Sequence, residues 1–487
     1  MALTKTMTEG APWKHILRFS LPVLAGSFLQ QFYNTVDAII VGKYAGEDAL
    51  SAVGTTTSFA FLFLALAIGF SSGNGVVVAQ YFGAGDDKNV RANGAAGVVF
   101  LMVLGVISAV LGIATARPAY ANWLNVDGSI LGLTVTYFRW YSLGLIFQFV
   151  YNIFSSILRA LGDSAATLYF LLISSLLNIG LDLLFVAVFR WSVTGAAVAT
   201  DISQLMSFIA AYLYTRRKYP VFRFGMGDLK WDPSRIKATV KVGLPISLQL
   251  IFVSLGFTFI QRAVNEFGKT MTAAFTVGQR METYLNFPCH AFQTTLATYT
   301  GQNIGAGKIR RVKAGAKQAV ALSLLLTLCI SVSVWVFADK ITALFSVSER
   351  AADYSLSFLR TVAVINILLA SYIPLFGVFQ GANHSGFPTL VSVSALGARV
   401  LATYLFRYSP FLGHTVIWWN GIFGFGLGFI MAWSYYLSGR WRKNSSLTGA
   451  GQYYDSNDFN DSLRGGLSPV LQQNGSAGAQ LQGGAGH

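Results

Sequence analysis

Residues 92–116 read ANGAAGVVFLMVLGVISAVLGIATA, a stretch without a single charged side chain. A helix needs about 20 mostly apolar residues to cross the hydrocarbon core of a bilayer, so this stretch predicts a transmembrane helix. Working outward from it, the same pattern predicts twelve spans and an all-α integral membrane protein. The spans are predicted near 16–42, 48–80, 92–116, 130–156, 165–188, 194–215, 237–264, 271–303, 314–337, 354–379, 387–407 and 415–438.

The composition agrees with lipid as the solvent. Hydrophobic residues make up 54% of the 487 and charged residues only 11%, whereas soluble proteins carry about 25% charged residues. The net charge of +15 would suggest a nucleic-acid partner for a soluble protein. Here the basic residues gather in a few loops, so membrane topology explains them and no nucleic-acid partner is expected. With only two cysteines, Cys289 and Cys329, a disulfide framework and a multi-cysteine metal site are excluded.

The distribution of Lys and Arg predicts the orientation. In the predicted topology 22 of them lie in loops and termini on one side, and seven lie on the other. The largest group falls in residues 216–241. Because an excess of Lys and Arg marks the cytoplasmic side, both termini are predicted to be cytoplasmic. The expected location is the cytoplasmic (inner) membrane, crossed many times.

An internal repeat divides the spans into two groups of six. The sequence QYFGAG at 80–85 recurs as QNIGAG at 302–307, and Pro22 near the start of the first span corresponds to Pro245 near the start of the seventh. Chance recurrence in a Gly-rich chain is the alternative, but the shared spacing and the matching position in the second cytoplasmic loop speak against it. Parallel six-helix repeats related by an axis along the membrane normal are a transporter architecture. We therefore predict two six-helix lobes related by pseudo-twofold symmetry.

The repeat gives the expected domain boundaries. They are a cytoplasmic N-terminus at 1–15, an N-lobe at 16–215, a basic cytoplasmic linker at 216–236, a C-lobe at 237–440 and a tail at 441–487. The tail is rich in Gly, Ser, Gln and Asn and has no apolar run. This composition predicts a disordered cytoplasmic segment that transport does not need.

Acids inside the spans are the candidate functional residues, because each costs about 3 kcal/mol or more at the bilayer centre and usually faces a cavity or a partner. Asp37 follows Tyr33 by four residues and Asp182 follows Asn178 by four, so each pair shares one helical face. Carboxylate, amide and hydroxyl oxygens together suit Na⁺ or a shared proton. A structural hydrogen-bond network is the alternative, and for Asp37 and Asp182 we favour function over it.

Three further charged residues are harder to assign. Asp201 can be functional or structural, with nothing in the sequence to decide between them. Glu282 lies two residues from Arg280, so the two side chains diverge by roughly 200° around the helix and each needs its own partner or cavity. Glu282 is therefore a cavity candidate, and Arg399 is expected to be a structural counter-charge.

The acid cluster does not follow the repeat. Asp37 corresponds to Phe259 or Ile260 in the second half, and Asn178 and Asp182 correspond to Arg399 and Thr403. One lobe alone is therefore expected to handle a coupling ion. The chain has no H-E-x-x-H, Walker-type or G-x-S-x-G motif. Without a nucleotide site, transport energy is expected from an ion gradient, and no cofactor is expected.

Five stretches together resemble the multidrug and toxic compound extrusion (MATE) family, within it the DinF-like branch, over about residues 10–440. They are YNTVDAIIVG at 33–42, RALGD at 159–163, NIGLD at 178–182, GAAVAT at 195–200 and GQNIGAG at 301–307. The resemblance implies two six-helix lobes around a central cavity. It also implies export of organic cations and other amphiphiles in exchange for H⁺ or Na⁺.

The resemblance also implies roles for individual residues. Asp37, Asn178, Asp182 and Thr200 match the family's N-lobe cation site, which is the one possible Na⁺ site expected and involves no other metal. Tyr33 and Tyr137 match supporting tyrosines, and Pro22 matches the proline at which the first helix bends. The acidic C-lobe site of other branches is not matched in the seventh or tenth span.

The expected function is a secondary active antiporter that exports amphiphilic or cationic small molecules by alternating access. It is expected to work as a monomer in the bilayer and not as an enzyme, with no catalytic residues. A lipid-linked saccharide flippase of the same superfamily is an alternative, although such proteins often have more spans and a more cationic cavity. A membrane-embedded enzyme is a third alternative. His290 is its one candidate catalytic residue, and no second catalytic group accompanies it in the sequence.

Overall fold

The computed structural model describes residues 6–225, 227–343, 345, 348–410 and 413–443. Every regular element within these ranges is a helix, so the predicted all-α class is confirmed. The predicted tail from residue 444 onward and the first five residues of the predicted N-terminus lie outside the described residues.

The first half of the chain forms the N-lobe. Its elements are α1 (Pro12–Ala45), α2 (Glu47–Gly83), α3 (Asp87–Pro118), η1 (Ala119–Trp123), α4 (Gly128–Ala160), α5 (Ser164–Asp182), η2 (Leu183–Val188), α6 (Ser192–Lys218) and η3 (Pro220–Phe222). Of these, η1 and η2 are π-helical continuations of α3 and α5, and η3 is a 3₁₀ turn.

The second half forms the C-lobe. Its elements are α7 (Pro233–Glu266), α8 (Lys269–Gly305), α9 (Ile309–Val336), α10 (Ala338–Ala343), α11 (Glu349–Gly381), α12 (Gly386–Phe406), η4 (Gly413–Thr415), α13 (Val416–Leu437) and η5 (Arg440–Arg442). The helix α7 begins at Pro233, so Lys237 and Lys241, assigned to the basic loop by the sequence, lie in its first turns. The side chain of Asp232 caps this helix by accepting from the backbone amides of Ser234 and Arg235.

Among the described residues, 10 helices are long and apolar enough to cross a membrane. The helices α1 and α8 are equally long, at 34 and 37 residues, but more polar. Together they give the twelve predicted spans in two lobes, and this prediction is confirmed. Polar side chains of α1 line one cavity and polar side chains of α8 line another.

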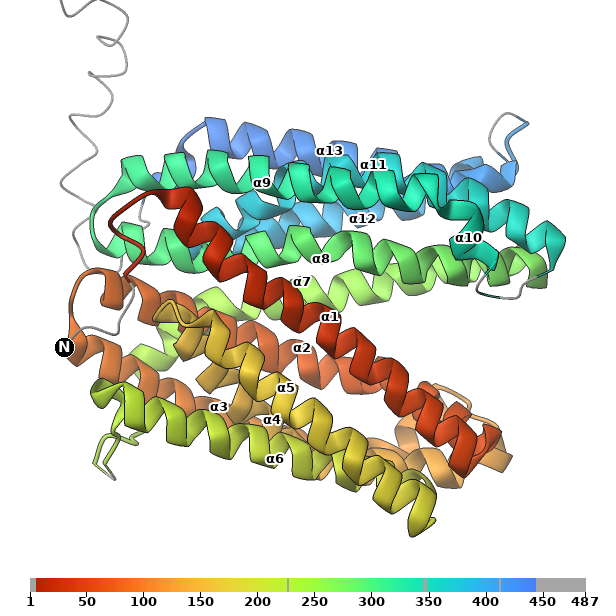
Figure 1. The fold of residues 1–487 in the computed structure, drawn as a ribbon, viewed down its shortest axis with the longest axis horizontal. Coiled ribbons are helices and arrows are strands. Elements are labelled where there is room, and N and C mark those ends of the chain that lie inside the picture. Colours follow the sequence, from red (N-terminus) through yellow and green to blue (C-terminus); the bar gives the residue numbers. More distant parts are fainter. Residues whose placement is uncertain (1–5, 226, 344, 346–347, 411–412, 444–487) are drawn as a thin grey trace, which may run out of the picture.

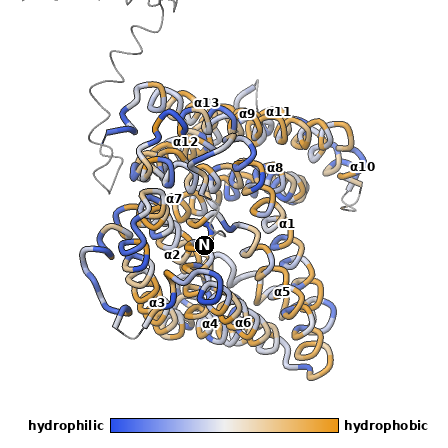
Figure 2. Tube along the Cα trace, turned by 60° about the vertical axis from the view of Figure 1, so that its left-hand side comes forward, coloured by the Kyte–Doolittle hydropathy of each residue, from blue (hydrophilic) through white to orange (hydrophobic). Residues whose placement is uncertain are grey.

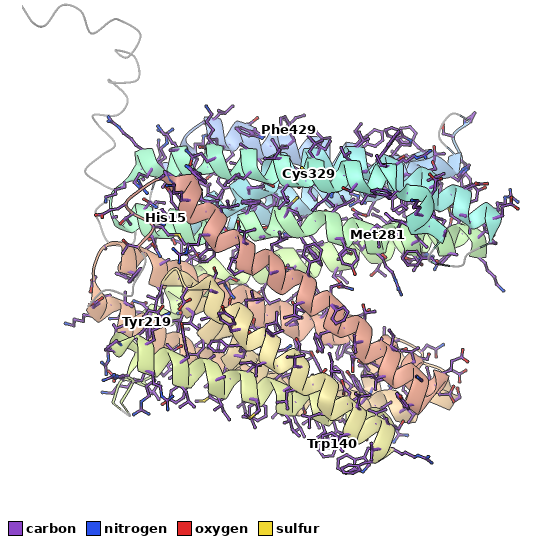
Figure 3. The ribbon with its side chains drawn as sticks, in the orientation of Figure 1. His15, Trp140, Tyr219, Met281, Cys329 and Phe429 are labelled. Carbon is purple, nitrogen blue, oxygen red and sulfur yellow. The ribbon has the colours of Figure 1, made fainter. Side chains whose placement is uncertain are left out.

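The outer surface of the helices is apolar. Val110, Leu325 and Ile430 are each 60% exposed or more, and the hydrophobic colouring follows the long helices while hydrophilic stretches gather in the connecting loops (Figure 2). Trp140 and Phe429 point outward from opposite faces of the molecule (Figure 3). An apolar belt of this extent is stable only in contact with lipid.

The lobes form two layers that lie close together at the end holding the N-terminus and diverge toward the other end (Figure 1). The helix α1 crosses from one layer to the other. Near its start, Ile16 and Phe19 pack in the C-lobe core with Phe292. Near its end, Ile40 and Val41 pack in an N-lobe core. This crossing ties the two lobes together at the narrow end.

The repeat reappears in the backbone. Gly46 and Gly268 precede α2 and α8 with φ angles of 90° and 91°. The helices α4 and α11 both have 33 residues. Each is followed by a residue in the left-handed region, Gly162 at φ 83° and Asn383 at φ 62°. The two halves therefore match residue by residue over these segments, with an offset of 221 for α4 and α11.

The repeated motif joins the two lobes. A methyl group on Gly83 would lie 1.9 Å from the carbonyl oxygen of Gln302, and one on Gly305 would lie 1.9 Å from that of Gln80. The side-chain amide of Gln80 donates to the Gly381 carbonyl at 2.8 Å. In the same way, Gln302 donates to the Ala160 carbonyl at 2.7 Å. We call this twofold-related contact, made by Gln80, Gly83, Gln302 and Gly305, the glutamine–glycine seam.

Candidate functional site

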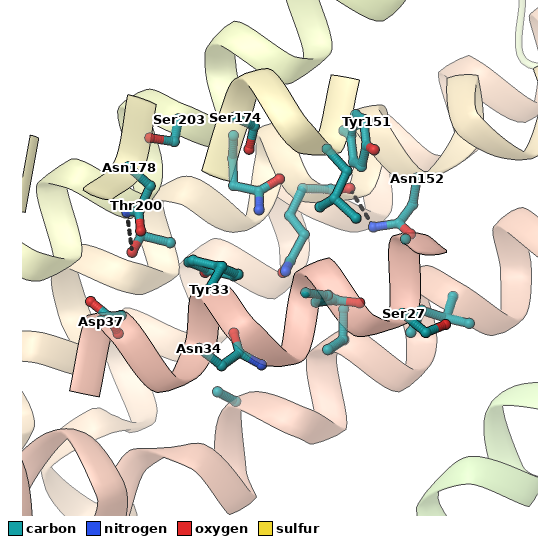
Figure 4. Close-up of a pocket in the computed structure, with 18 of the residues that line it drawn as sticks. Ser27, Tyr33, Asn34, Asp37, Tyr151, Asn152, Ser174, Asn178, Thr200 and Ser203 are labelled. Carbon is teal, nitrogen blue, oxygen red and sulfur yellow. Dashed lines mark hydrogen bonds between the residues drawn. The ribbon is translucent and has the colours of Figure 1, made fainter. Parts of the chain in front are cut away.

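A cavity of about 600 Å³ lies in the N-lobe. It is lined by α1, α2, α4, α5 and α6, with Thr294 of α8 closing one side. Figure 4 shows Asp37, Asn178 and Thr200 at one end of this cavity, with Tyr33 beside them, and Tyr151 and Asn152 toward the other. The cavity therefore has a carboxylate end that brings together residues from three helices.

Asp37 and Asp182 form the centre of this carboxylate end. Asp37 lines the cavity from α1, and Asp182, the last residue of α5, is fully buried. The two carboxyl groups lie close enough to interact electrostatically. No described residue donates to Asp37 Oδ1 or to either oxygen of Asp182. Two ionised carboxylates this close repel each other, and a shared proton or cation would relieve that repulsion.

Asn178 and Thr200 add neutral oxygens beside the pair. The Asn178 amide donates a long hydrogen bond of 3.5 Å to Thr200 Oγ1, which itself donates to the Ala196 carbonyl at 3.0 Å. The Asn178 Oδ1 atom is buried and receives no donor from the described residues. Buried acceptors without donors are rare and point to a missing proton or ion. Carboxylate, amide and hydroxyl oxygens in one place fit H⁺ or Na⁺.

The helix changes form at this point. The α-helical part of α5 ends at Asp182, and Leu183–Val188 continue as a π-helix. π-helical turns interrupt regular packing and occur often at functional sites. This turn was not predictable from the sequence, because Leu183–Val188 are uniformly apolar.

The other predicted N-lobe residues lie around the same cavity. Tyr33 and Tyr137 both line it, and Tyr137 stacks on Tyr141 with ring centroids 6.2 Å apart. Pro22 also lines the cavity, some four turns of α1 away from Asp37. The helix α1 continues without a break through Pro22, so the role of Pro22 as a hinge stays a prediction.

Glu282 lies apart from this group. It lines a second cavity of about 460 Å³ in the C-lobe and is buried 3.7 Å from Arg399 Nη1. Arg399 in turn donates to Asn420 Oδ1 at 2.9 Å, and its guanidinium lies over the rings of Phe257 and Phe425. Glu282 therefore has its own counter-charge in the other lobe.

Asp201 is not among the residues that line the N-lobe cavity. Its carboxyl group packs directly on the backbone of Gly144, where a methyl group would lie 1.8 Å from Oδ1. A side chain at position 144 would displace this carboxyl group. Asp201 thus fixes the approach of α6 to α4.

Sequence reasoning missed one strongly charged lining residue. Arg159 was assigned to the loop between the fourth and fifth spans, but it lies in the last turn of α4 and its side chain lines the cavity. A signal was present. The polar lining residues of α4 recur at helical spacing, at Tyr137, Tyr141, Gln148, Asn152, Ser155 and Arg159. That face, followed to its end, includes Arg159.

Clusters of three or more His, Cys, Asp or Glu side chains that could hold a metal ion are absent from the described part of the chain. The carboxylate pair with its neutral oxygens is a smaller set of oxygen ligands. It suits a monovalent ion or a proton better than a tightly held transition metal.

Comparisons with known proteins identify the family. A sequence model of the MatE family matches residues 22–184 and 245–405, one stretch in each half of the chain. The "Probable multidrug resistance protein YpnP" of Bacillus subtilis is 28% identical over 446 residues, covering 89% of this chain and 97% of that protein.

Solved structures share the fold. A transporter of the MOP superfamily from Pyrococcus furiosus, described as having a binding pocket of reverse polarity, superimposes with a TM-score of 0.83 at 25% identity, covering 90% of this chain and 97% of that one. A structure described as the outward-facing conformation of a multidrug resistance MATE family transporter gives 0.82 at 25% identity, covering 89% and 97%. With two matched halves, a twelve-helix two-lobe fold and this cavity, the chain belongs to the MatE family of multi-pass membrane transporters.

Proposed function

We propose that this transporter exports amphiphilic and cationic small molecules through the N-lobe cavity in exchange for H⁺ or Na⁺. The observation that carries the proposal is the proximity of the Asp37 and Asp182 carboxyl groups beside a cavity of about 600 Å³, with buried oxygens that no described residue supplies with a donor. The name of the Bacillus relative, a probable multidrug resistance protein, supports small-molecule drugs as the substrate class.

The exchange follows from electrostatics. With the carboxylate pair carrying negative charge, a cationic substrate in the cavity is attracted to Asp37. When a proton or Na⁺ binds the pair, that charge is neutralised and the attraction is lost. The ion and the substrate therefore compete for the negative charge of the carboxylate pair. Because only one of them binds at a time, an inward ion gradient drives the substrate outward. This linkage needs no nucleotide and no second protein, so we propose that a monomer suffices.

Orientation and alternating access complete the proposal. The end of the molecule at the glutamine–glycine seam also holds the start of the described chain and Lys443 near its end, whose carbonyl accepts from His384. This end carries most of the Lys and Arg residues, so we assign it to the cytoplasm. The seam is then a closed cytoplasmic gate in the inner membrane. Because the seam is symmetric between the repeats, rocking of the lobes can part it and open the cavity to the inside.

Transport by purified protein in liposomes tests the proposal. Wild-type protein should move a cationic dye uphill when a pH or Na⁺ gradient is imposed, and each gradient applied alone identifies the ion. Asp37→Asn should abolish gradient-driven movement, because the pair can then no longer change its charge. Asp201→Asn is the matched control, since it removes an acid of the same lobe that does not line the cavity.

The control should retain gradient-driven transport. Uphill export by Asp37→Asn at the wild-type rate would refute coupling through this pair. Loss in both variants would assign the effect to the stability of the lobe, and thermal melting of the purified proteins distinguishes that case.

A further inference from the structure

Arg159 brings a positive charge into a cavity whose other end is acidic. Its side chain lines the cavity from the last turn of α4. Side chains of a helix tilt toward its N-terminus, so the guanidinium extends back along α4 in the direction of Asn152. Among the residues that the structure describes, Arg159 has no ion pair and no side-chain hydrogen bond. Its guanidinium is therefore free to bind an anion that enters the cavity.

The surroundings of Arg159 do not need its charge. The last carbonyls of α4 are already used, those of Ile157, Leu158 and Arg159 by backbone amides and that of Ala160 by Gln302. The helix end is therefore satisfied without the side chain of Arg159.

The nearest acid along the chain is also occupied. Asp163 accepts hydrogen bonds of 2.8 Å from Tyr214, Lys218 and Tyr219, and its other oxygen caps α5 at the Ala166 amide. The positive charge of Lys218 already balances this carboxylate. Arg159 therefore has no structural counter-ion in its own loop.

The second repeat provides an internal reference. The helices α4 and α11 correspond with an offset of 221, so Gln380 is the twofold-related counterpart of Arg159. Gln380 is buried, and its Oε1 atom accepts from Gln293 at 3.3 Å. The backbone turn that follows is the same in both lobes. The fold thus accepts a neutral glutamine at this position, and the charge of Arg159 is particular to the N-lobe cavity.

We propose that Arg159 is a recognition site for an oxyanion, so that the transporter accepts amphiphiles carrying a carboxylate or phosphate group. This inference rests on the proposed function and specifies its substrate class. The planar guanidinium binds carboxylate and phosphate oxygens in a bidentate manner. The cavity is then bipolar, with the Asp37 pair at one end and Arg159 at the other. A zwitterionic amphiphile fits both ends, and its oxyanion end lies toward the glutamine–glycine seam.

Two dyes that differ only in one carboxylate give the test. Rhodamine B carries a free carboxylate, and its ethyl ester has the same rings without that negative charge. Dissociation constants are measured by fluorescence anisotropy with purified protein in detergent. Arg159→Gln, the residue found at the equivalent C-lobe position, should weaken binding of rhodamine B by about tenfold or more. Binding of the ester should be unchanged.

Matched variants separate charge from structure. Arg159→Lys keeps the charge and should recover part of the affinity. Arg117→Gln removes one exposed arginine outside the cavity and should leave both dissociation constants unchanged. Equal weakening of both dyes by Arg159→Gln, or a wild-type protein that binds the ester but not rhodamine B, overturns the proposal. The second result refutes the oxyanion site but not the proposed export of cations. If rhodamine B binding depends on Arg159 but no ion gradient drives dye export, only the proposed antiport is refuted.

The oxyanion can belong to a soluble compound or to a lipid headgroup. Liposomes containing fluorescent phosphatidylglycerol report lipid movement between leaflets through quenching by external dithionite. Lipid movement that Arg159→Gln removes supports the proposal with a lipid as the source. Rhodamine B binding that depends on Arg159, without lipid movement, supports it with a soluble amphiphile as the source.

Discussion

Asn178 contributes a neutral oxygen beside the carboxyl groups of Asp37 and Asp182. A change at this one residue can therefore distinguish Na⁺ coupling from H⁺ coupling. Its Oδ1 atom is buried and receives no donor among the described residues. Na⁺ needs several oxygen ligands, whereas a proton needs only a carboxylate. If Na⁺ is the ion, Asn178→Ala should raise the Na⁺ concentration for half-maximal transport by about tenfold or more. If H⁺ is the ion, the same variant should leave the pH dependence of transport nearly unchanged.

Asp163 supports the loop between α4 and α5 through its charge. Burial alone would raise the pKa of Asp163, but hydrogen bonds from Lys218, Tyr214 and Tyr219 outweigh it and lower the pKa below the usual value. A lowered folded-state pKa contributes stability that is present above the unfolded value, about 3.9, and is lost as pH falls through the folded value. Asp163→Asn should therefore destabilise the protein by about 2 kcal/mol at neutral pH.

Thermal melting of purified protein at several pH values checks this. The difference between Asp163→Asn and wild type should be constant from pH 6 to pH 8. It should shrink as the pH falls below about 4, where the unfolded chain takes up the proton first, and vanish once the native carboxylate is also protonated. A difference that stays constant into strong acid would show that charge plays no part.

Residue patterns predicted the carboxylate end of the cavity but not its other end. Asp37 and Asp182 stand out because acids are rare inside apolar spans, and their helical spacing to Tyr33 and Asn178 is local. Arg159 sits at a helix end, and sequence alone does not show whether a terminal side chain turns to water or back into a cavity. The contact of Glu282 with Arg399 joins α8 to α12, and no local pattern contains such a pairing.

Among the helices, α1 is the element that connects ion binding with lobe movement. Pro22 has no amide hydrogen to complete the helical hydrogen bond, so α1 has a weak point in the wall of the cavity. Pro245 is the equivalent in α7, but its carbonyl oxygen accepts from Thr389 at 2.7 Å, which ties the bend to α12. The two prolines thus occupy equivalent positions in the repeat, but the backbone at Pro245 is held by a hydrogen bond to α12.

We expect Pro22→Ala to slow dye export several-fold and Pro245→Ala to slow it less. The reason is that the alanine restores a hydrogen bond and stiffens the element that carries Asp37. Initial transport rates in liposomes, at equal amounts of inserted protein, measure both. Equal rates for the two variants would show that Pro22 is a fixed kink without a role in turnover.

The lengths of the helices were predictable because the thickness of the bilayer sets them. The helices α1 and α8 differ from the other spans in being more polar, and this difference indicates the cavities. Both helices were found from their length and overall apolarity, yet neither meets a strict hydropathy criterion. Their polar side chains line the two cavities. The π-helical end of α5 was not predictable, because a change in helix type is set by packing and not by the identity of Leu183–Val188.

At the scale of the whole molecule, the repeat decides the architecture. The recurrence of the motif at 80–85 and 302–307 predicted two equivalent lobes, and the structure shows that the two copies meet each other across the twofold axis. Sequence could not show this contact, because the two copies lie 222 positions apart in the chain. The function proposed for the protein requires that this contact open and close in every transport cycle.

A reversible cross-link through the seam tests that requirement most directly. A Cβ atom on Gly301 would lie 3.1 Å from that of Ala79 in the opposite lobe, close to the separation of about 3.5–4.5 Å in a disulfide. Ala79→Cys with Gly301→Cys, in a chain carrying Cys289→Ser and Cys329→Ser, should lock the cytoplasmic end when oxidised. Dye export in liposomes should stop on oxidation and return on reduction, while each single variant stays active under both conditions. Full export by the oxidised, cross-linked protein would contradict alternating access through this seam.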